Sequence, residues 1–283
     1  MDLSRRFLFE ATDIRGDIVQ ITQSYRDLVA NHDYPAEVQW LLGEFVVAGL
    51  LLGSTIKFQG RLILQVRSQG AVPLLMVEIT HDHTFRGIAR LVEEADVSGA
   101  EFAELFAGGS LVVTVDPDDG ERYQSLVPMD GANLAACLMH YFAQSEQLST
   151  WLLLTADDHG AAGFLLQQLP KQLVQSDQQR SLNWEHVRVM GETLKTEELR
   201  TLTVEQILNR LYHDQKVRVL AEHEVRFLCS CSRERMASAL VALGESELDD
   251  LFSDQAEVEL TCEFCNNQFS FDRAGIYDAV TQG

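Results

Sequence analysis

The sequence predicts an α+β protein, with helices packed on an antiparallel sheet in an N-terminal domain, then a helical linker and a small C-terminal module. Three observations support this: strand and helix signals alternate from the N-terminus to Pro170, the pattern changes at Lys171, and four of five cysteines form two close pairs near the C-terminus. A chain of 283 residues is long enough for one full core and a smaller module. We therefore expect domains at 1–170, 171–228 and 229–283.

The N-terminal domain is expected to be mainly sheet. Its strand-like runs are short, apolar or alternating, and DPDDGE supplies a hairpin turn between two of them. A buried central helix is expected after Asn31, with Asp33 and Pro35 at its start and apolar residues nearly all round. The expected strands are 6–12, 16–22, 61–68, 73–80, 111–116, 122–129 and a pair within 150–170, and further helices precede Asn31 and cover 131–148.

The linker, residues 171–228, contains two or three short helical segments interrupted at Gly191 and Thr203. Its apolar stripe is narrow and its charge is high. Isolated helices shorter than ~12 to 15 residues hardly form in water. We therefore expect the linker to have low intrinsic stability and to depend on docking against a neighbour.

The C-terminal module is predicted to hold two short helices and a hairpin. Ser232 can start a helix that ends at Gly244, with Leu240 and Leu243 on one face. A second helix is expected in ESELDDLF, followed by the strand EVELTC, which pairs with NQFSFD.

Composition argues against several partners. The chain has 22 basic and 43 acidic residues, a net charge of -21, which repels nucleic acid and anionic membranes. The most apolar run, Glu44–Gly53, is shorter than the ~20 residues of a membrane span, and acids interrupt the N-terminal stretch, so no secretory signal is expected. We therefore expect a cytoplasmic protein. In a reducing cytosol, paired cysteines are usually metal ligands or redox groups.

The cysteines have metal-ligand spacing. Cys229 and Cys231 form C-x-C, Cys262 and Cys265 form C-x-x-C, and thirty residues separate the pairs. Zinc takes four thiolates in a tetrahedron, which two such pairs can supply. Asn266 and the following Asn tolerate the left-handed backbone of a turn that points N–H groups at sulfur.

Three other interpretations of the cysteines are open. In the first, zinc has a purely structural role and cross-links a module that is too small to have its own hydrophobic core. A nucleic-acid-binding ribbon is disfavoured, because residues 229–283 hold eleven acids against three arginines and no lysine. A thioredoxin-like catalyst needs C-x-x-C at a helix N-terminus, whereas this motif lies between strand-like runs.

The C-x-C pair can close a disulfide only in a small strained ring. Such disulfides are labile, which favours a redox switch over a permanent cross-link.

Other candidate sites are weaker. His81 and His83 lie two residues apart but have no evident third ligand, so we interpret THDHT as a polar turn between strands. Cys137 lies in an apolar helix and is expected to be a core thiol. The chain has no ATP-binding G-x-x-x-x-G-K-[ST] motif and no evident catalytic triad, so we expect no enzyme.

The motifs CSCSRER and CEFCNNQFSF, with IRGD, NHDYP, RGIAR, GERYQ, KTEEL and RLYH, resemble the heat-shock protein 33 family, the redox-regulated chaperonins of bacteria. Met236 stands where some members have another cysteine. The resemblance implies an ATP-independent holdase that is inactive while reduced and bound to one zinc ion. It implies that oxidants and unfolding conditions form disulfides Cys229–Cys231 and Cys262–Cys265, release zinc, and produce a dimer that binds unfolding client proteins.

Physical chemistry is consistent with this expectation. A structural zinc site provides roughly 10 to 16 kcal/mol of apparent binding free energy, so a small module that loses zinc should unfold. Unfolding of the C-terminal module should loosen the adjacent linker and expose its apolar residues, which we expect to form the client-binding surface. These residues are Leu182, Trp184, Leu199, Ile207, Leu208 and Leu211. A thiol-disulfide oxidoreductase using the same cysteines is the alternative function.

Overall fold

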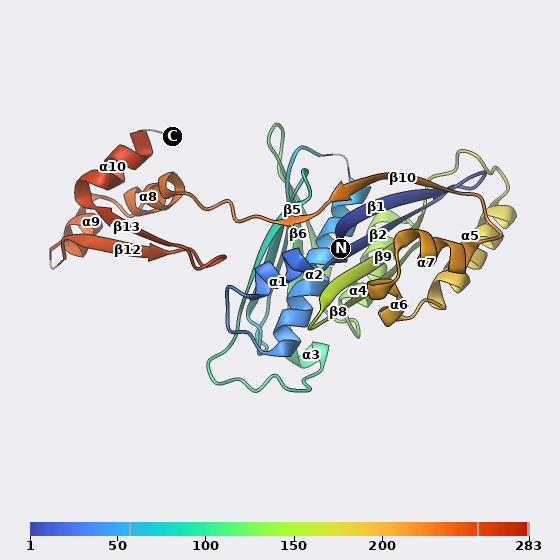
Figure 1. Cartoon of the computed structure of the whole chain (residues 1–283), viewed down its shortest axis with the longest axis horizontal. Helices are drawn as coiled ribbons and strands as arrows, with labels where there is room; N and C mark the ends of the chain where they lie inside the picture. Colours follow the sequence, from blue (N-terminus) through green and yellow to red (C-terminus); the bar gives the residue numbers. More distant parts are fainter. Residues whose placement is uncertain (57, 254, 282–283) are drawn as a thin grey trace. The chain divides into compact units, whose positions relative to one another are not determined.

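The computed structural model describes residues 1–56, 58–253 and 255–281. The chain divides into two compact units, Met1–Phe227 and Leu228–Gly283, which we call unit 1 and unit 2 (Figure 1). Most of the linker segment therefore belongs to unit 1, where it supplies three helices and two strands.

The described residues of unit 1 form two sheets, whereas one sheet was expected from the sequence. The five-stranded sheet has the order β10-β1-β2-β9-β8, with antiparallel neighbours throughout. Its strands are β1 (Asp2–Phe9), β2 (Ile14–Ile21), β8 (Thr150–Asp157), β9 (Gly160–Gln168) and β10 (Val217–Glu224). The predicted β8–β9 strand pair is confirmed.

The six-stranded sheet has the order β11-β5-β4-β3-β6-β7. Its strands are β3 (Gly60–Arg67), β4 (Leu74–Thr80), β5 (Thr84–Arg90), β6 (Ser110–Pro117), β7 (Tyr123–Pro128) and β11 (Arg226–Phe227). The β6–β7 hairpin confirms the turn predicted at DPDDGE. All neighbours are antiparallel except β11 and β5, which are parallel.

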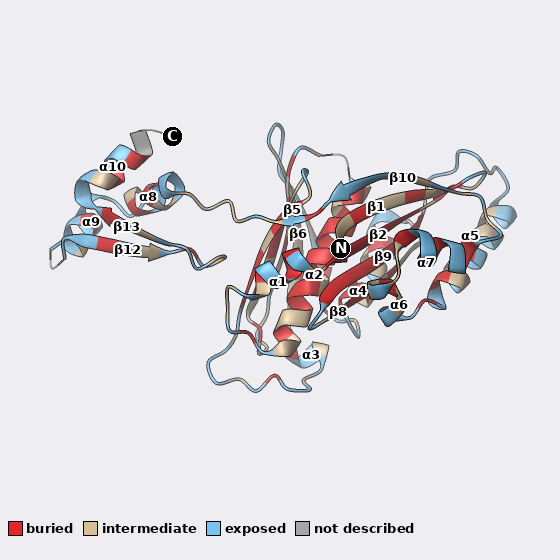
Figure 2. Cartoon of the chain, viewed as in Figure 1, coloured by how far each residue is buried: buried red, intermediate tan, exposed pale blue. Residues whose placement is uncertain are grey.

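The central helix α2 (Ala36–Thr55) contacts strands of both sheets and is buried nearly all round (Figure 2). Pro35, not Asp33, is its N-cap. Glycines let the layers approach: a Cβ on Gly163 of β9 would lie 2.3 Å from Val47, and one on Gly49 would lie 2.7 Å from Ile79 of β4. The helix is long and apolar enough to span a membrane, but it is mostly buried as the core helix of unit 1.

Shorter helices complete this core. They are α1 (Gln23–Val29), α3 (Phe102–Leu105), α4 (Leu134–Tyr141) and the π-helix η1 (Phe142–Glu146). Asn133 caps α4 by accepting the N–H of Ala136. Cys137 on this helix is buried in the main core, as predicted.

Helices α5 (Asp177–Glu192), α6 (Thr196–Thr201) and α7 (Val204–Tyr212) cover the other face of the five-stranded sheet. Side chains alternate between the faces of a strand, so Val19 and Leu165 meet the main core while Ile18 and Phe164 meet these helices. After α7, the chain forms β10, which pairs with β1. β10 was not predicted from the sequence.

The described residues of unit 2 form a hairpin and three short helices, one helix more than expected from the sequence. Its elements are α8 (Arg233–Val241), α9 (Glu245–Leu251), β12 (Glu257–Thr261), β13 (Gln268–Asp272) and α10 (Arg273–Thr281). Ser232 caps α8 by accepting the N–H of Arg235, as predicted. Leu240 is buried, but the expectation that Leu243 shares its face is wrong, because α8 ends before Leu243, which is 47% exposed.

Candidate metal centre

The two cysteine motifs of unit 2 lie together. Cys229 and Cys231 lie in the segment before α8, Cys262 follows β12, and Cys265 lies in the turn that leads to β13. The Sγ atoms of Cys229 and Cys262 are 3.7 Å apart, and those of Cys231 and Cys265 are 3.4 Å apart. Each close contact therefore joins one motif to the other.

The donor set fits a tetrathiolate metal site. All four Sγ atoms lie within 4.8 Å of one another. A tetrahedron with Zn–S bonds of ~2.3 Å has S···S edges of about 3.8 Å, whereas a disulfide requires about 2.05 Å. The four cysteines are free thiols. Among residues 1–56, 58–253 and 255–281, this is the only cluster of three or more Cys, His, Asp or Glu arranged to hold a metal ion.

The C-x-x-C turn is shaped by backbone hydrogen bonds. Cys262 donates its N–H to Asn267 O at 2.9 Å, and Asn266 donates to Cys262 O at 2.8 Å. Asn266 has φ +55°, the left-handed conformation expected from the sequence. Burial opposes ionisation of Cys262, but N–H groups of Phe264 and Cys265 point at its sulfur and hold the pKa of this thiol below its usual value.

The other thiols have a different electrostatic environment. Burial raises the pKa of Cys265, although the N–H of Asn267 opposes this, and neighbouring thiols raise it further. Burial also raises the pKa of Cys231, with a contribution from Cys229. Ionisation of all four neighbouring thiols has a large free-energy cost unless a cation compensates their negative charge.

The C-x-C segment is fixed from α8. Arg235 donates from Nη1 to the carbonyl oxygen of Ser230 at 2.8 Å, so the residue between the two cysteines is held by the helix that follows. The guanidinium of Arg233 lies 4.4 Å from the ring centre of Phe271, which belongs to the core of unit 2. The Ser230 hydroxyl is buried and has no hydrogen-bond partner among the described residues.

Most of the predicted client-binding residues are covered in this structure. The buried ones lie in the apolar layer between α5–α7 and the five-stranded sheet, and Trp184 is partly buried against it. The buried members are Leu199, Ile207, Leu208 and Leu211. Leu182 lies apart from them and is 58% exposed, so docking of the helices does not cover it.

The histidine pair lies in the turn between β4 and β5, as predicted. His81 accepts the N–H of Gly60 at Nδ1, over 3.1 Å, and His83 stacks on His223 of β10 with ring centres 4.5 Å apart. The contact between His83 and His223 has no local signal in the sequence, because it forms only when β10 pairs with β1 in the five-stranded sheet.

Comparison with known proteins identifies the family. The model of the family described as Hsp33 protein matches residues 2–272. The chain belongs to the Hsp33 family. It is 46% identical to the 33 kDa chaperonin of Pseudomonas paraeruginosa over 276 residues, covering 97% of this chain and 93% of the relative. It is 45% identical to the 33 kDa chaperonin of Pseudomonas syringae pv. syringae over 284 residues, covering 100% and 95%.

The fold is also that of Hsp33. The crystal structure of the 33 kDa chaperonin from Thermotoga maritima, a heat shock protein 33 homologue, aligns with a TM-score of 0.82 at 20% identity. The match covers 100% of this chain and 99% of the other. Met236 is partly buried and packs against the small core of unit 2.

Proposed function

We propose that this chain is a redox-regulated, ATP-independent chaperone of the cytoplasm, a holdase that prevents unfolding proteins from aggregating. The observation that carries the proposal is the gathering of four free thiols, from two distant motifs, in a unit with few other buried groups. Family membership and the chaperonin names of the relatives support the chaperone role.

In the reduced, inactive state, Cys229, Cys231, Cys262 and Cys265 would hold one Zn²⁺. The bound ion would neutralise thiolate charge and cross-link the segment before α8 to the β12–β13 turn. The backbone N–H groups of Phe264 and Cys265 would orient the Cys262 thiolate toward it.

Oxidation would break this cross-link. One thiolate of a pair attacks the peroxide and becomes a sulfenic acid, releasing hydroxide as the O–O bond breaks. The second thiolate then attacks that sulfur and expels a second hydroxide, and the protons given up by the two thiols convert both hydroxides to water. In total, two thiols and one hydrogen peroxide give one disulfide and two water molecules. We propose Cys229 with Cys231 and Cys262 with Cys265, pairs that remove all four ligands and release the metal.

The client surface is proposed to be the apolar layer that α5–α7 now cover. If these helices lift, the buried residues of both the helices and the sheet face become accessible to unfolded chains. The net charge of -21 keeps such a species soluble, and the active form is proposed to be a homodimer. No ATP, nucleic acid or membrane enters this scheme.

The experiment follows three signals while peroxide and mild heat are applied: zinc release, far-UV CD, and light scattering by a denatured client. We expect stoichiometric suppression of scattering only after zinc release. Release of zinc without any change in client aggregation would contradict the proposal. Turnover in an insulin-reduction assay with a thiol donor would instead favour a thiol-disulfide oxidoreductase.

A further inference from the structure

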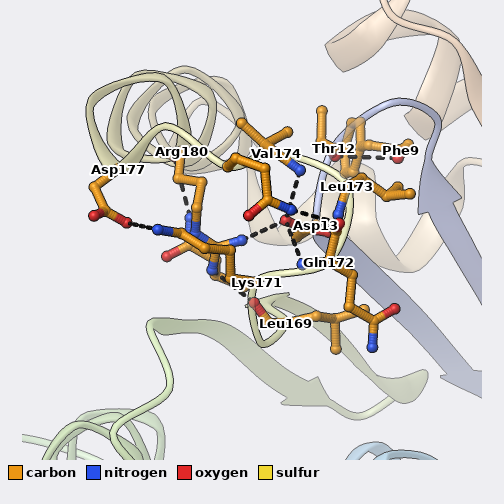
Figure 3. Close-up of polar contacts among 12 residues, drawn as sticks. Phe9, Thr12, Asp13, Leu169, Lys171, Gln172, Leu173, Val174, Asp177 and Arg180 are labelled. Atoms are coloured by element: carbon orange, nitrogen blue, oxygen red, sulfur yellow. Dashed lines mark hydrogen bonds and ion pairs between the residues drawn. The ribbon is translucent and has the colours of Figure 1, made fainter.

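Asp13, in the β1–β2 turn, is a buried carboxylate that binds the start of the linker segment (Figure 3). Its oxygens accept the N–H groups of Gln172, Leu173 and Val174 at 3.3, 2.8 and 3.2 Å. Its Oδ2 also pairs with Arg180 Nη1 of α5 at 2.5 Å. One side chain near the N-terminus therefore contacts three consecutive amides and a guanidinium from a distant part of the chain.

The Asp13 side of this contact is rigid. Its neighbour Ile14 is paired with Gln168 in the sheet, and the carbonyl of Asp13 accepts the N–H of Leu169 at 2.7 Å. Burial disfavours the charged form of Asp13, but the three N–H groups and Arg180 outweigh this and hold its pKa below the usual value. The carboxylate is thus charged at neutral pH and positioned by the sheet.

The linker side has few other attachments. Residues 171–173 and 175–179 are exposed, and Leu173 is 65% exposed. Apart from the Asp13 contacts, Arg180 donates to Leu169 O at 2.7 Å, and its own carbonyl accepts from Gln168 at 3.1 Å. The first buried residue of α5 is Val187, three turns into the helix. Trp184, about two turns into α5, is partly buried against the apolar layer. Before Trp184, the beginning of α5 is therefore held mainly by Asp13 and Arg180.

We propose that the Asp13–Arg180 contact is an autoinhibitory latch that holds α5 against the five-stranded sheet and sets how readily the linker segment is released. The proposal rests on the proposed function, because it assigns to Asp13 and Arg180 the control of when the covered apolar layer opens. These are positioning residues, and the cysteines remain the sensor.

The first test measures amide hydrogen exchange in the reduced, zinc-loaded full chain. Asp13→Asn keeps the shape but loses the charge, and Arg180→Met keeps the stem but loses the guanidinium. We expect both to accelerate exchange at Gln172–Val174 and in the first turns of α5 by about 10- to 100-fold. Asp177→Asn, which breaks the exposed Lys171–Asp177 pair in the same segment, is the matched control and should change exchange less than about 3-fold.

The second test measures the peroxide dose and temperature needed for half-maximal protection of a client. Asp13→Asn and Arg180→Met should lower both, while the Asp177→Asn threshold and the zinc affinity stay at the wild-type values. The double variant should resemble the single ones, because both residues act through one contact.

The outcomes separate the two proposals. If oxidised wild type fails to protect the client, the proposed function is overturned. If wild type protects the client, two results would overturn the latch. In the first, both latch variants exchange faster but need the same peroxide dose and temperature as wild type. In the second, their amide exchange is no faster than that of Asp177→Asn. The second variant guards against misfolding of the first, and far-UV CD of each reduced variant verifies the fold.

Discussion

The two units differ in what holds them together. Among the described residues, the main core of unit 1 joins forty buried hydrophobic residues around α2, and a second cluster of fifteen lies beneath α5–α7. The core of unit 2 joins seven. Burial of apolar surface can account for the stability of unit 1, whereas a module as small as unit 2 generally needs an added cross-link. We therefore expect unit 2 to depend on its four cysteines in a way that unit 1 does not.

The largest expected effect is on unit 2. Cys262→Ser removes the sulfur that receives two backbone N–H groups, and it should abolish most of the roughly 10 kcal/mol or more that a bound metal ion would contribute. We expect unit 2 to unfold while unit 1 stays folded. NMR spectra would show this as loss of dispersion for residues 228–283 alone.

Cys137→Ser is the matched control, because this thiol is buried in unit 1 and takes no part in the cluster. It should leave metal affinity unchanged. If unit 2 stayed folded after complete removal of metal from the reduced protein, the expected dependence of unit 2 on its cysteines would be wrong.

The next effect is on the core of unit 1. Phe45 is fully buried on α2 and packs against Phe106 with ring centres 5.9 Å apart. Phe45→Ala should lower the free energy of unfolding of unit 1 by about 3–5 kcal/mol, because it leaves a cavity between the sheets. Urea denaturation measures this change. Metal affinity in unit 2 should not move, and a parallel loss there would show that the units are not independent.

A smaller, pH-dependent effect is expected at Glu44 on α2. Burial raises the pKa of this carboxyl to about 7. A raised acid pKa penalises the folded state once pH exceeds the unfolded-state pKa of about 4.3, and the penalty grows until pH passes about 7. Glu44→Gln should therefore stabilise unit 1 by about 1–3 kcal/mol at pH 8 and by much less near pH 5.

Urea denaturation at both pH values checks this expectation, with Glu37→Gln on the same helix as control. If Glu44→Gln raised the free energy of unfolding equally at pH 5 and pH 8, the Glu44 carboxyl would not titrate between these pH values.

The smallest effect returns to unit 2. Arg233, the first residue of α8, lies two positions after Cys231 and over the Phe271 ring. Arg233→Ala should cost about 0.5–1 kcal/mol, because an exposed cation–π contact contributes little. A competition titration with a chelator would measure a few-fold loss of metal affinity. A loss as large as that of Cys262→Ser would show that unit 2 is held by its packing more than by its thiols.

Local patterns in the sequence predicted much of this structure. The buried helix, the β6–β7 and β8–β9 hairpins and the cap at Ser232 follow from periodicity and turn chemistry over a few residues. The grouping of the cysteines follows from their spacing and from zinc chemistry. Each of these features is encoded within a short stretch of chain.

Features that depend on distant pairing were missed. β10 joins β1 from the opposite end of the unit 1 sequence, and its only local signal is the short alternation Val217, Arg218, Val219. The division into two sheets is not encoded in any single strand. Asp13 gave no signal either, because the amides that surround it belong to another part of the chain.

The pairing of β1 with β10 has a mechanical consequence. Leu3 lies opposite Glu224, so the N-terminal end of unit 1 and the point where its chain leaves are adjacent ends of an antiparallel pair. Once the short pairing of β11 with β5 is broken, tension applied between Met1 and Leu228 would separate β1 and β10 one residue pair at a time, instead of shearing all the pairs at once. We therefore expect unit 1 to yield at low force along this direction despite its large core, and to resist more strongly when pulled between other points.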